Sequence, residues 1–174
     1  MFQCCIIEDM SDKESGSTPF YAGGLRFSCT QCGGESRCCR GRPGVVQLGQ
    51  DDLARLARAE GLTEEQFIQA FCRWVPEGNG WEFLSLRDLS NYDCVLWGKN
   101  GCSVYEARPA QCRTYPFWPF IVEDEDSWKS EAKDCPGIGC GELHSREEIE
   151  AELKEYGREE RIRRRHKEWW EDEE

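Results

Sequence analysis

Apolar residues recur at helical spacing in two adjacent stretches of the first half of the chain. The first stretch predicts a short helix that Asp51 caps and Gly61 closes, and the second follows residues 63–66, whose order T-E-E-Q has the form of a capping box. Cys72 is expected on the second helix, as a buried small hydrophobic residue. The apolar faces consist of Leu53, Leu56 and Ala57 in the first helix and Phe67, Ile68 and Phe71 in the second. The two helices are expected to close one side of a small core.

Short runs of β-forming residues predict strands on either side of these helices. Residues 45–48 (V-V-Q-L) form a candidate strand that ends at Gly49. Residues 81–86 form a second candidate strand, which follows the turn signal E-G-N-G at residues 77–80.

A hairpin is predicted around a second turn signal, G-K-N-G at residues 98–101. Its two strands, residues 94–97 and residues 102–105, each begin with a cysteine. Because neighbouring antiparallel strands lie within side-chain reach of each other, Cys94 and Cys102 could serve a common metal ion.

Residues 108–120 (R-P-A-Q-C-R-T-Y-P-F-W-P-F) combine three prolines with four aromatic residues. Proline fixes φ and is excluded from the interior of regular helices and strands, so a rigid, ordered loop is expected. This loop would hold Cys112 in place, and a tight turn at residues 134–137 would present Cys135. The side chains expected to pack the loop are Tyr115, Phe117, Trp118 and Phe120.

Charged residues dominate the chain beyond Cys140. A helix is expected to begin near Ser145 and to break at Gly157. Its apolar positions are Ile149, Leu153 and Tyr156. The Arg- and Glu-rich remainder is expected to be an exposed tail helix, whose charge pairs are worth only about 0.2–0.5 kcal/mol each. His166 is expected to be solvated there, and the Trp pair at residues 169–170 could dock onto the domain or onto a protein partner.

Composition limits how much of this chain a core can hold together. Of the 174 residues, 39% are hydrophobic and 32% are charged, so the core is expected to be small, and the 12 cysteines could supply further stability. Residues 1–7 lack the basic flank and apolar length of an export signal, and no run approaches the roughly 18 apolar residues of a membrane span. A cytosolic location is therefore expected, where cysteine clusters bind metal more often than they form disulfides. The disulfide alternative would require an export route.

The net charge of −12 argues against nucleic acid as a partner, because binding phosphates requires a basic face. Local basic patches are conceivable at residues 37–42 and 161–165. No membrane partner is expected.

The predicted fold class is α+β. A small, irregular, cysteine-rich metal-bound domain with short helices and β-hairpins is expected over residues 21–143. A flexible leader over residues 1–20 precedes it, and a charged helix or tail over residues 144–174 follows.

Eight cysteines form two groups that only a fold can bring together. A thiolate is the soft ligand that zinc and iron–sulfur centres select, so this pattern favours metal binding over reactive-thiol chemistry. Gly33 and Gly34 allow the backbone to turn its amides inward beside the first group. The first group is Cys29, Cys32, Cys38 and Cys39, and the second is Cys94, Cys102, Cys112 and Cys135.

The cysteines belong to longer motifs that occur between about residues 25 and 140: F-S-C-x2-C-G-G, C-C-R-G, G-C-S-V-Y-x2-R-P-x2-C-R-x-Y-P-F and C-P-G. In these motifs the chain resembles the YkgJ-type cysteine-cluster family, zinc- or iron-chelating CxxCxxCC proteins that are also described as iron–sulfur oxidoreductases. Flagellin lysine N-methylases are similar in their cysteine cluster. The chain departs from the short form of the name motif, because five residues rather than two separate Cys32 from Cys38.

The resemblance implies that all eight cysteines are metal ligands: Cys29, Cys32, Cys38, Cys39, Cys94, Cys102, Cys112 and Cys135. Arg108, Arg113 and Tyr115 accompany them in the motifs. The arginines could hydrogen-bond sulfur or an anionic substrate, or they could form ion pairs that fix the proline-rich loop.

Eight thiolates suit one or two centres, either four-cysteine zinc sites or an iron–sulfur cluster with further thiols left over. The spacing of the cysteines serves both. His144 is expected at the surface or at a cap rather than as a ligand. Roles for Cys4, Cys5 and Cys140 stay open, Cys140 being either a spare ligand or a thiol without a ligand role.

The leading prediction is a small metal-binding protein. The alternative is an enzyme, an oxidoreductase or a methylase relative, that acts beside the cluster. The chain has no dinucleotide or phosphate-loop motif and no recognisable catalytic triad.

Overall fold

The computed structural model describes residues 18–30, 37–158 and 160–166. Within these residues the chain forms two compact units of mixed α and β structure, with five short α-helices and three small antiparallel sheets, which confirms the predicted α+β class. Of the described residues, unit 1 comprises 18–30, 37 and 116–154, and unit 2 comprises 38–115, 155–158 and 160–166. The predictions that concern the leader, Cys4, Cys5, Cys32, Gly33, Gly34, Trp169 and Trp170 lie outside the described residues. None of the described helices combines the length and apolar character needed to cross a membrane.

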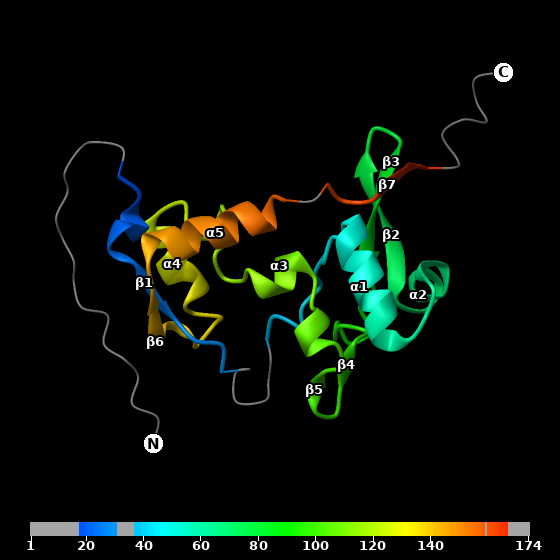
Figure 1. Ribbon diagram of the computed structural model, residues 1–174, viewed down its shortest axis with the longest axis horizontal. Coiled ribbons are helices and arrows are strands. Elements are labelled where there is room, and N and C mark those ends of the chain that lie inside the picture. The colour runs from blue at the N-terminus through cyan, green and yellow to red at the C-terminus, as the bar shows by residue number, and fades with distance from the viewer. Residues whose placement is uncertain (1–17, 31–36, 159, 167–174) are drawn as a thin grey trace. The chain divides into compact units, whose positions relative to one another are not determined.

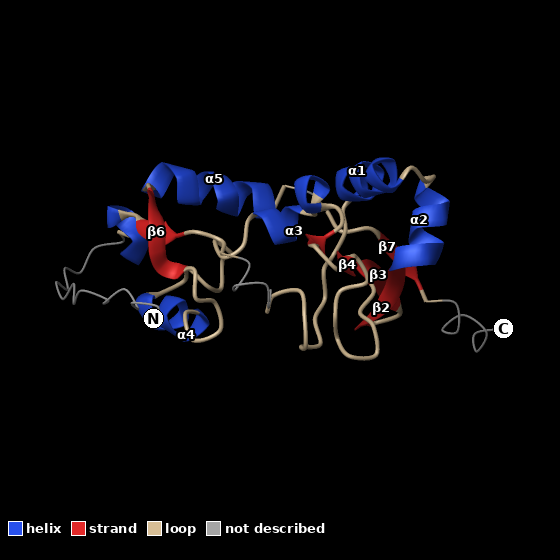
Figure 2. Ribbon diagram, turned by 90° about the horizontal axis from the view of Figure 1, so that it is seen from below, coloured by secondary structure: helices blue, strands red, loops and turns tan. Residues whose placement is uncertain are grey.

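Two helices of unit 2, α1 (Gln50–Glu60) and α2 (Glu64–Phe71), lie on one side of a small sheet (Figures 1 and 2). The predicted capping box begins α2: the Gln66 amide donates to Thr63 Oγ1 at 3.2 Å, and the Thr63 amide donates to Gln66 Oε1 at 2.9 Å. Helix α1 ends at Gly61 as predicted. Its N-cap is Gly49, however, so the prediction that Asp51 caps it is wrong. Asp51 lies in the first turn, where its charge favours the positive end of the helix.

The sheet of unit 2 has the antiparallel order β2–β3–β7, with β2 at Cys72–Gly78, β3 at Trp81–Leu86 and β7 at Arg163–Arg165. The predicted strand at residues 81–86 is thus confirmed. Cys72 opens β2 opposite Leu86, so its placement on the second helix is wrong, although its predicted burial is confirmed. The chain becomes extended at Cys72 because the Trp and Val that follow favour β structure and pair with β3.

Residues 45–48 run beside β3 as an extended segment rather than as a strand of their own. The Leu48 amide donates to Leu84 O at 3.1 Å, and the Leu86 amide donates to Val46 O at 3.0 Å. Leu48, Leu84 and Leu86 are buried with the apolar faces of α1 and α2, and together they form the core of unit 2.

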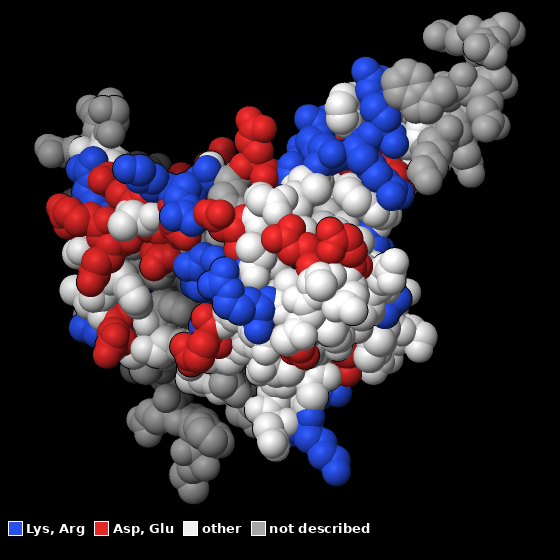
Figure 3. Space-filling model, turned by 45° about the vertical axis from the view of Figure 1, so that its right-hand side comes forward, with Lys and Arg blue, Asp and Glu red and all other residues white. Residues whose placement is uncertain are grey.

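Strand β7 replaces the tail helix that the sequence predicted. Arg164 forms an ion pair with Glu82 at 2.8 Å and stacks over Trp74 at 4.0 Å, and His166, expected to be solvated, lies 3.5 Å from Glu82. Aromatic faces and carboxylates on β2 and β3 attract these arginines more strongly than exposed helical charge pairs would. Basic side chains gather over the region of β7 in Figure 3.

The predicted hairpin is present but shorter than expected. Strands β4 (Trp97–Gly98) and β5 (Gly101–Cys102) place Trp97 opposite Cys102. Cys94 lies before β4 and bridges to Asp88 instead. After Cys102 the chain enters a 3-10 helix, η3 (Tyr105–Ala107), rather than continuing as a strand.

The proline-rich segment contains a helix, α3 (Ala110–Arg113), so the expectation of a loop without regular structure is wrong there. Pro109 stands just outside the helix as its N-cap, where its missing amide costs nothing. Phe117 is buried as predicted. Phe120 is 57% exposed, although its ring lies 5.5 Å from that of Trp118 in the same segment.

Unit 1 contains β1 (Leu25–Phe27) paired with β6 (Ile138–His144), the 3-10 helix η1 (Phe20–Gly23), α4 (Glu125–Glu131) and α5 (Arg146–Tyr156). Sequence patterns predicted α5 only, and Ser145 caps it by accepting from the Glu148 amide at 3.3 Å. The core of the unit is aromatic: Phe117 contacts Phe27 edge-on at 6.0 Å and stacks on Trp128 at 5.9 Å.

Candidate metal centre

Three separate segments of unit 2 bring five thiols together. Residues 38–39 run beside the segment before β4, because the Cys94 amide donates to Cys39 O at 2.7 Å. The Cys38 and Cys39 sulfurs lie 3.7 Å apart. The five cysteines, each of which interacts electrostatically with others of the set, are Cys38, Cys39, Cys94, Cys102 and Cys112.

A buried aspartate fixes the first of these segments. Arg40 Nε donates to Asp93 Oδ2 at 3.1 Å, and the Gly41 amide donates to Asp93 Oδ1 at 3.2 Å. The guanidinium of Arg40 also lies 5.6 Å from the ring centre of Trp97. Asp93 is next to Cys94 in the chain, so these contacts hold the Cys38–Cys39 pair close to Cys94. Sequence reasoning missed Asp93, and a single acidic residue in a loop carries no pattern that could have revealed it.

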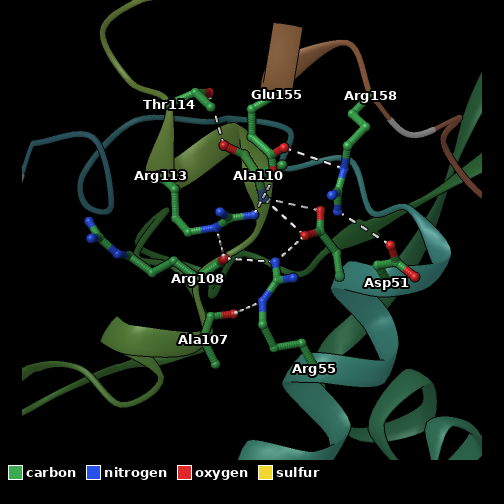
Figure 4. A network of polar contacts seen from close by, with 10 residues as sticks. Asp51, Arg55, Ala107, Arg108, Ala110, Arg113, Thr114, Glu155 and Arg158 are labelled. Carbon is green, nitrogen blue, oxygen red and sulfur yellow. Dashed lines mark hydrogen bonds and ion pairs between the residues drawn. The ribbon is translucent and has the colours of Figure 1, made fainter. Parts of the chain in front are cut away.

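A second buried aspartate, Asp52, fixes helix α3, which carries Cys112. Figure 4 shows Arg55 and Ala110 of the polar network around it. Asp52 accepts the Ala110 amide at 3.0 and 3.2 Å and pairs with Arg55. Arg55 in turn donates to Ala107 O at 3.3 Å and to Arg108 O at 3.1 Å. The 3-10 helix and α3 are thereby held against α1. Asp52 lies four residues before the buried Leu56, so its place on the apolar face of α1 was a signal that could have found it.

Burial and mutual repulsion disfavour ionisation of these thiols. Burial is the main cause that raises the pKa of Cys94, Cys102 and Cys112, and neighbouring thiolates raise these values further. The hydrogen bond with Cys38, followed by burial, raises the pKa of Cys39 far above its ordinary value. A metal cation bound among these sulfurs would offset both the cost of burying the thiolates and their mutual repulsion.

Backbone amides oppose this effect at two of the cysteines. The amide of Leu96 donates to the Cys94 sulfur and the amide of Val104 donates to the Cys102 sulfur, and each hydrogen bond lowers the pKa of its thiol. In both cases the donor lies two residues after the cysteine. Such donors favour the thiolate over the thiol.

Arg108 and Arg113 make mainly structural contacts. Arg108 Nε donates to Tyr105 O at 2.7 Å and its guanidinium stacks over the Tyr105 ring at 3.6 Å. Arg113 donates to Arg108 O at 3.0 Å and forms an ion pair with Glu155 at 3.0 Å. The positive charge of Arg108 also lowers the pKa of Cys102 and Cys112, so it favours thiolates in this cluster.

Three of the eight predicted ligands, Cys29, Cys32 and Cys135, lie in unit 1 or outside the described residues. Cys29 is exposed just after β1, and Cys135 is half-buried at the start of a turn in which the Ile138 amide donates to Cys135 O at 3.1 Å. Cys32 lies outside the described residues. His144 is half-buried rather than at the surface, because its Nε2 lies 3.0 Å from Phe27 O and its ring lies 4.9 Å from that of Phe117.

Cys72 differs from the five clustered cysteines in its surroundings. It is buried in the apolar core of unit 2, and burial raises the pKa of its thiol to about 12. This is the expected behaviour of a small hydrophobic residue.

Across residues 18–30, 37–158 and 160–166, no three His, Cys, Asp or Glu side chains are arranged to hold a metal ion as they stand. Unit 2 also contains a pocket of about 360 Å³, whose lining includes Gln47, Asp52, Gln111 and Arg161 and none of the cysteines.

Comparison with known proteins identifies the family. Residues 28–136 match the CxxCxxCC family, described as a "Putative zinc- or iron-chelating domain". The match covers more than half of the chain, so the chain belongs to this family. No solved structure gives a significant match to the chain.

Proposed function

We propose that unit 2 binds zinc or iron through thiolates drawn from its five gathered cysteines. The observation that carries this proposal is the electrostatic proximity of thiols from three segments that are far apart in sequence: Cys38 and Cys39, Cys94 and Cys102, and Cys112. Membership of a zinc- or iron-chelating family supports metal as the ligand of this cluster.

The spacing of the adjacent pair fits one tetrahedral ion. Two thiolates bound at about 2.3 Å to a tetrahedral centre lie roughly 3.8 Å apart. The Cys38 and Cys39 sulfurs are 3.7 Å apart. A four-iron cluster takes one thiolate per iron, which would separate this pair, so the spacing favours a single ion or a two-iron cluster.

The surroundings of the cluster favour bound thiolates. The amides of Leu96 and Val104 already point at the Cys94 and Cys102 sulfurs, and Arg108 supplies positive charge nearby. Hydrogen bonds of this kind orient metal-bound sulfur and tune its donor strength. A bound ion would cross-link the three segments, so its binding free energy would contribute directly to folding.

A reducing compartment such as the cytosol suits this function, because the cysteines must stay reduced to bind metal. The contacts of Arg108 and Arg113 give no support to a substrate site beside the cluster. We therefore propose metal binding as the function of unit 2.

The test is metal and sulfide analysis of protein purified without oxygen, together with a visible spectrum. Stoichiometric zinc in a colourless protein, or iron with acid-labile sulfide and absorption near about 400 nm, would support the proposal and identify the centre. A matched pair of variants locates it: Cys112→Ser should lose metal, and Cys72→Ser should retain it. A folded wild-type protein with neither zinc nor iron would refute the proposal.

A further inference from the structure

Strand β7 is an edge strand of the sheet in unit 2. It pairs with β3 on one side, and among the described residues the sheet has no strand on its other side. The Leu84 amide donates to Ile162 O and the His166 amide donates to Gly80 O, both at 2.9 Å. In an antiparallel pair such bonds recur at every second residue, so the amide and carbonyl of Arg163 point away from β3. The strand therefore offers an outer edge to which a further strand can be added.

Arginine side chains line this edge with an excess of positive charge. Arg161 and Arg163 pair with the same carboxylate, that of Glu77, and the contact of Arg163 is 2.7 Å. The Glu77 side chain is only 19% exposed, whereas the side chains of Arg161 and Arg163 are 36% and 41% exposed. Two exposed cations thus share one more deeply buried anion. Figure 3 shows the basic side chains that gather over this region.

Aromatic rings orient the same two guanidinium groups. The guanidinium of Arg163 lies 4.9 Å from the ring centre of Trp81, and that of Arg161 lies 5.2 Å from the ring centre of Phe83. A stacked guanidinium turns its flat face to the ring, and the N–H donors in its plane can still bind a carboxylate. Because stacking already restricts the side chains, less conformational freedom is lost when they form a new ion pair.

A pocket of about 360 Å³ adjoins the start of β7. Its lining includes Arg161 and Arg163 together with Gln47, Gln111 and Tyr156. When a peptide is added to a sheet edge, main-chain hydrogen bonds supply affinity and pockets for alternate side chains supply specificity. This pocket can receive a side chain of a strand bound beside Arg163.

We propose that the outer edge of β7 binds an extended acidic segment of a partner protein as an added strand. Alternate residues of a strand lie about 6.6–6.8 Å apart, so acidic residues at alternate positions can meet the arginines of β7. A second copy of β7 at this edge would place arginine against arginine, which is destabilising. Single-stranded RNA binds largely by stacking its bases on aromatic rings, and here guanidinium groups lie over Trp81 and Phe83.

The test measures binding of a fluorescein-labelled peptide, in which glutamate alternates with valine, to the full-length protein by fluorescence anisotropy. The peptide should bind, and added salt should weaken the binding because the charges are exposed. Arg163→Gln should weaken it by about fivefold. Arg146→Gln removes the same charge from an exposed arginine of unit 1 and should leave the affinity unchanged. No binding, or equal effects of the two variants, would overturn the proposal.

A second measurement needs no variant and reports on the edge itself. Amide hydrogen exchange of the wild-type protein, followed by NMR, should become slower at Arg163 when the peptide is bound. The Arg164 amide faces Glu82 of β3 in either case, so its exchange should not change. An Arg163 amide that exchanges equally fast with and without peptide would overturn strand addition.

Other occupants of the edge would give different results, each of which contradicts the proposal. Protection of the Arg163 amide without peptide, increasing with protein concentration, would indicate a second copy of the chain. The same protection at every concentration would indicate the acidic residues 171–174 of this chain. Tighter binding of oligouridine than of the peptide, weakened by Arg163→Gln, would indicate a nucleic-acid site.

Discussion

Two neighbouring aspartates on α1 allow a sharp test of how the Cys112 segment is held. The Asp52 side chain is 4% exposed and accepts the Ala110 amide, whereas the Asp51 side chain is 69% exposed and pairs with Arg158 at 3.3 Å. Asp52→Ala should therefore destabilise the protein substantially, and Asp51→Ala should not. Both residues lie in the first turn, so both substitutions lose a similar interaction with the helix dipole.

The magnitude follows from the contacts of Asp52. Leaving the buried Ala110 amide without an acceptor costs about 1–3 kcal/mol. The ion pair with Arg55 adds up to about 1 kcal/mol, because the Arg55 side chain is 30% exposed and its other hydrogen bonds remain. The free energy of unfolding should fall by about 1–4 kcal/mol in Asp52→Ala, and by less than about 1 kcal/mol in Asp51→Ala.

The assay is urea unfolding of both variants, followed by circular dichroism and tryptophan fluorescence at fixed zinc concentration. Because Ala110 begins the helix that carries Cys112, Asp52→Ala should also weaken zinc binding, and Asp51→Ala should leave zinc affinity unchanged. Equal losses of stability in the two variants would refute the reasoning, because they would show that the buried carboxylate contributes nothing beyond its charge at the helix end.

Other features lead to further measurable outcomes. Burial raises the pKa of Cys94 and Cys112, so both thiols keep their protons at neutral pH; zinc affinity should rise with pH, and calorimetry in two buffers should show about one proton released per bound cysteine. In the metal-free protein the pH dependence has the opposite sign. The free energy of unfolding should fall above about pH 8.5, because thiols ionise in the unfolded chain while the buried thiols of the folded chain keep their protons. A flat pH profile would contradict this. Thr63→Ala should cost about 1 kcal/mol in thermal or urea unfolding, with Thr63→Ser close to wild type. Gly137→Ala should cost about 1–3 kcal/mol because its Cβ meets the Ser28 backbone, whereas Gly44→Ala, which meets nothing within 4 Å, should be neutral; equal effects would exclude the close approach.

Local signals in the sequence predicted the elements that depend on neighbouring residues. The capping box at Thr63, the Gly61 end of α1 and the Ser145 start of α5 all rest on contacts within a few residues, and all are present. The turn at residues 77–80 likewise joins β2 to β3. These features needed no knowledge of the rest of the chain.

Elements that depend on distant partners could not be predicted in this way. Strand β1 has three residues, and β6 contains two glycines in its run I-G-C-G-E-L-H, so neither strand carries a clear alternation of apolar and polar residues. Strand β7 is rich in arginine. It forms because its arginines pair with Glu82 and stack over Trp74 and Trp81 of the sheet. A helical charge pattern was the stronger local signal, and the tertiary contacts outweighed it.

The sequence by itself established the chemistry of this protein: clustered thiols in the motifs of a metal-chelating family, in a chain with little apolar material for a core. It could not establish which thiols meet. Within unit 2, for example, the fold brings Cys38 within electrostatic reach of Cys94 and Cys112, which lie more than 50 residues further along the chain. The reason is physical: a metal site is defined by distances of a few ångströms between side chains, and in unit 2 hydrogen bonds to buried aspartates far apart in the sequence position the segments that carry the thiols.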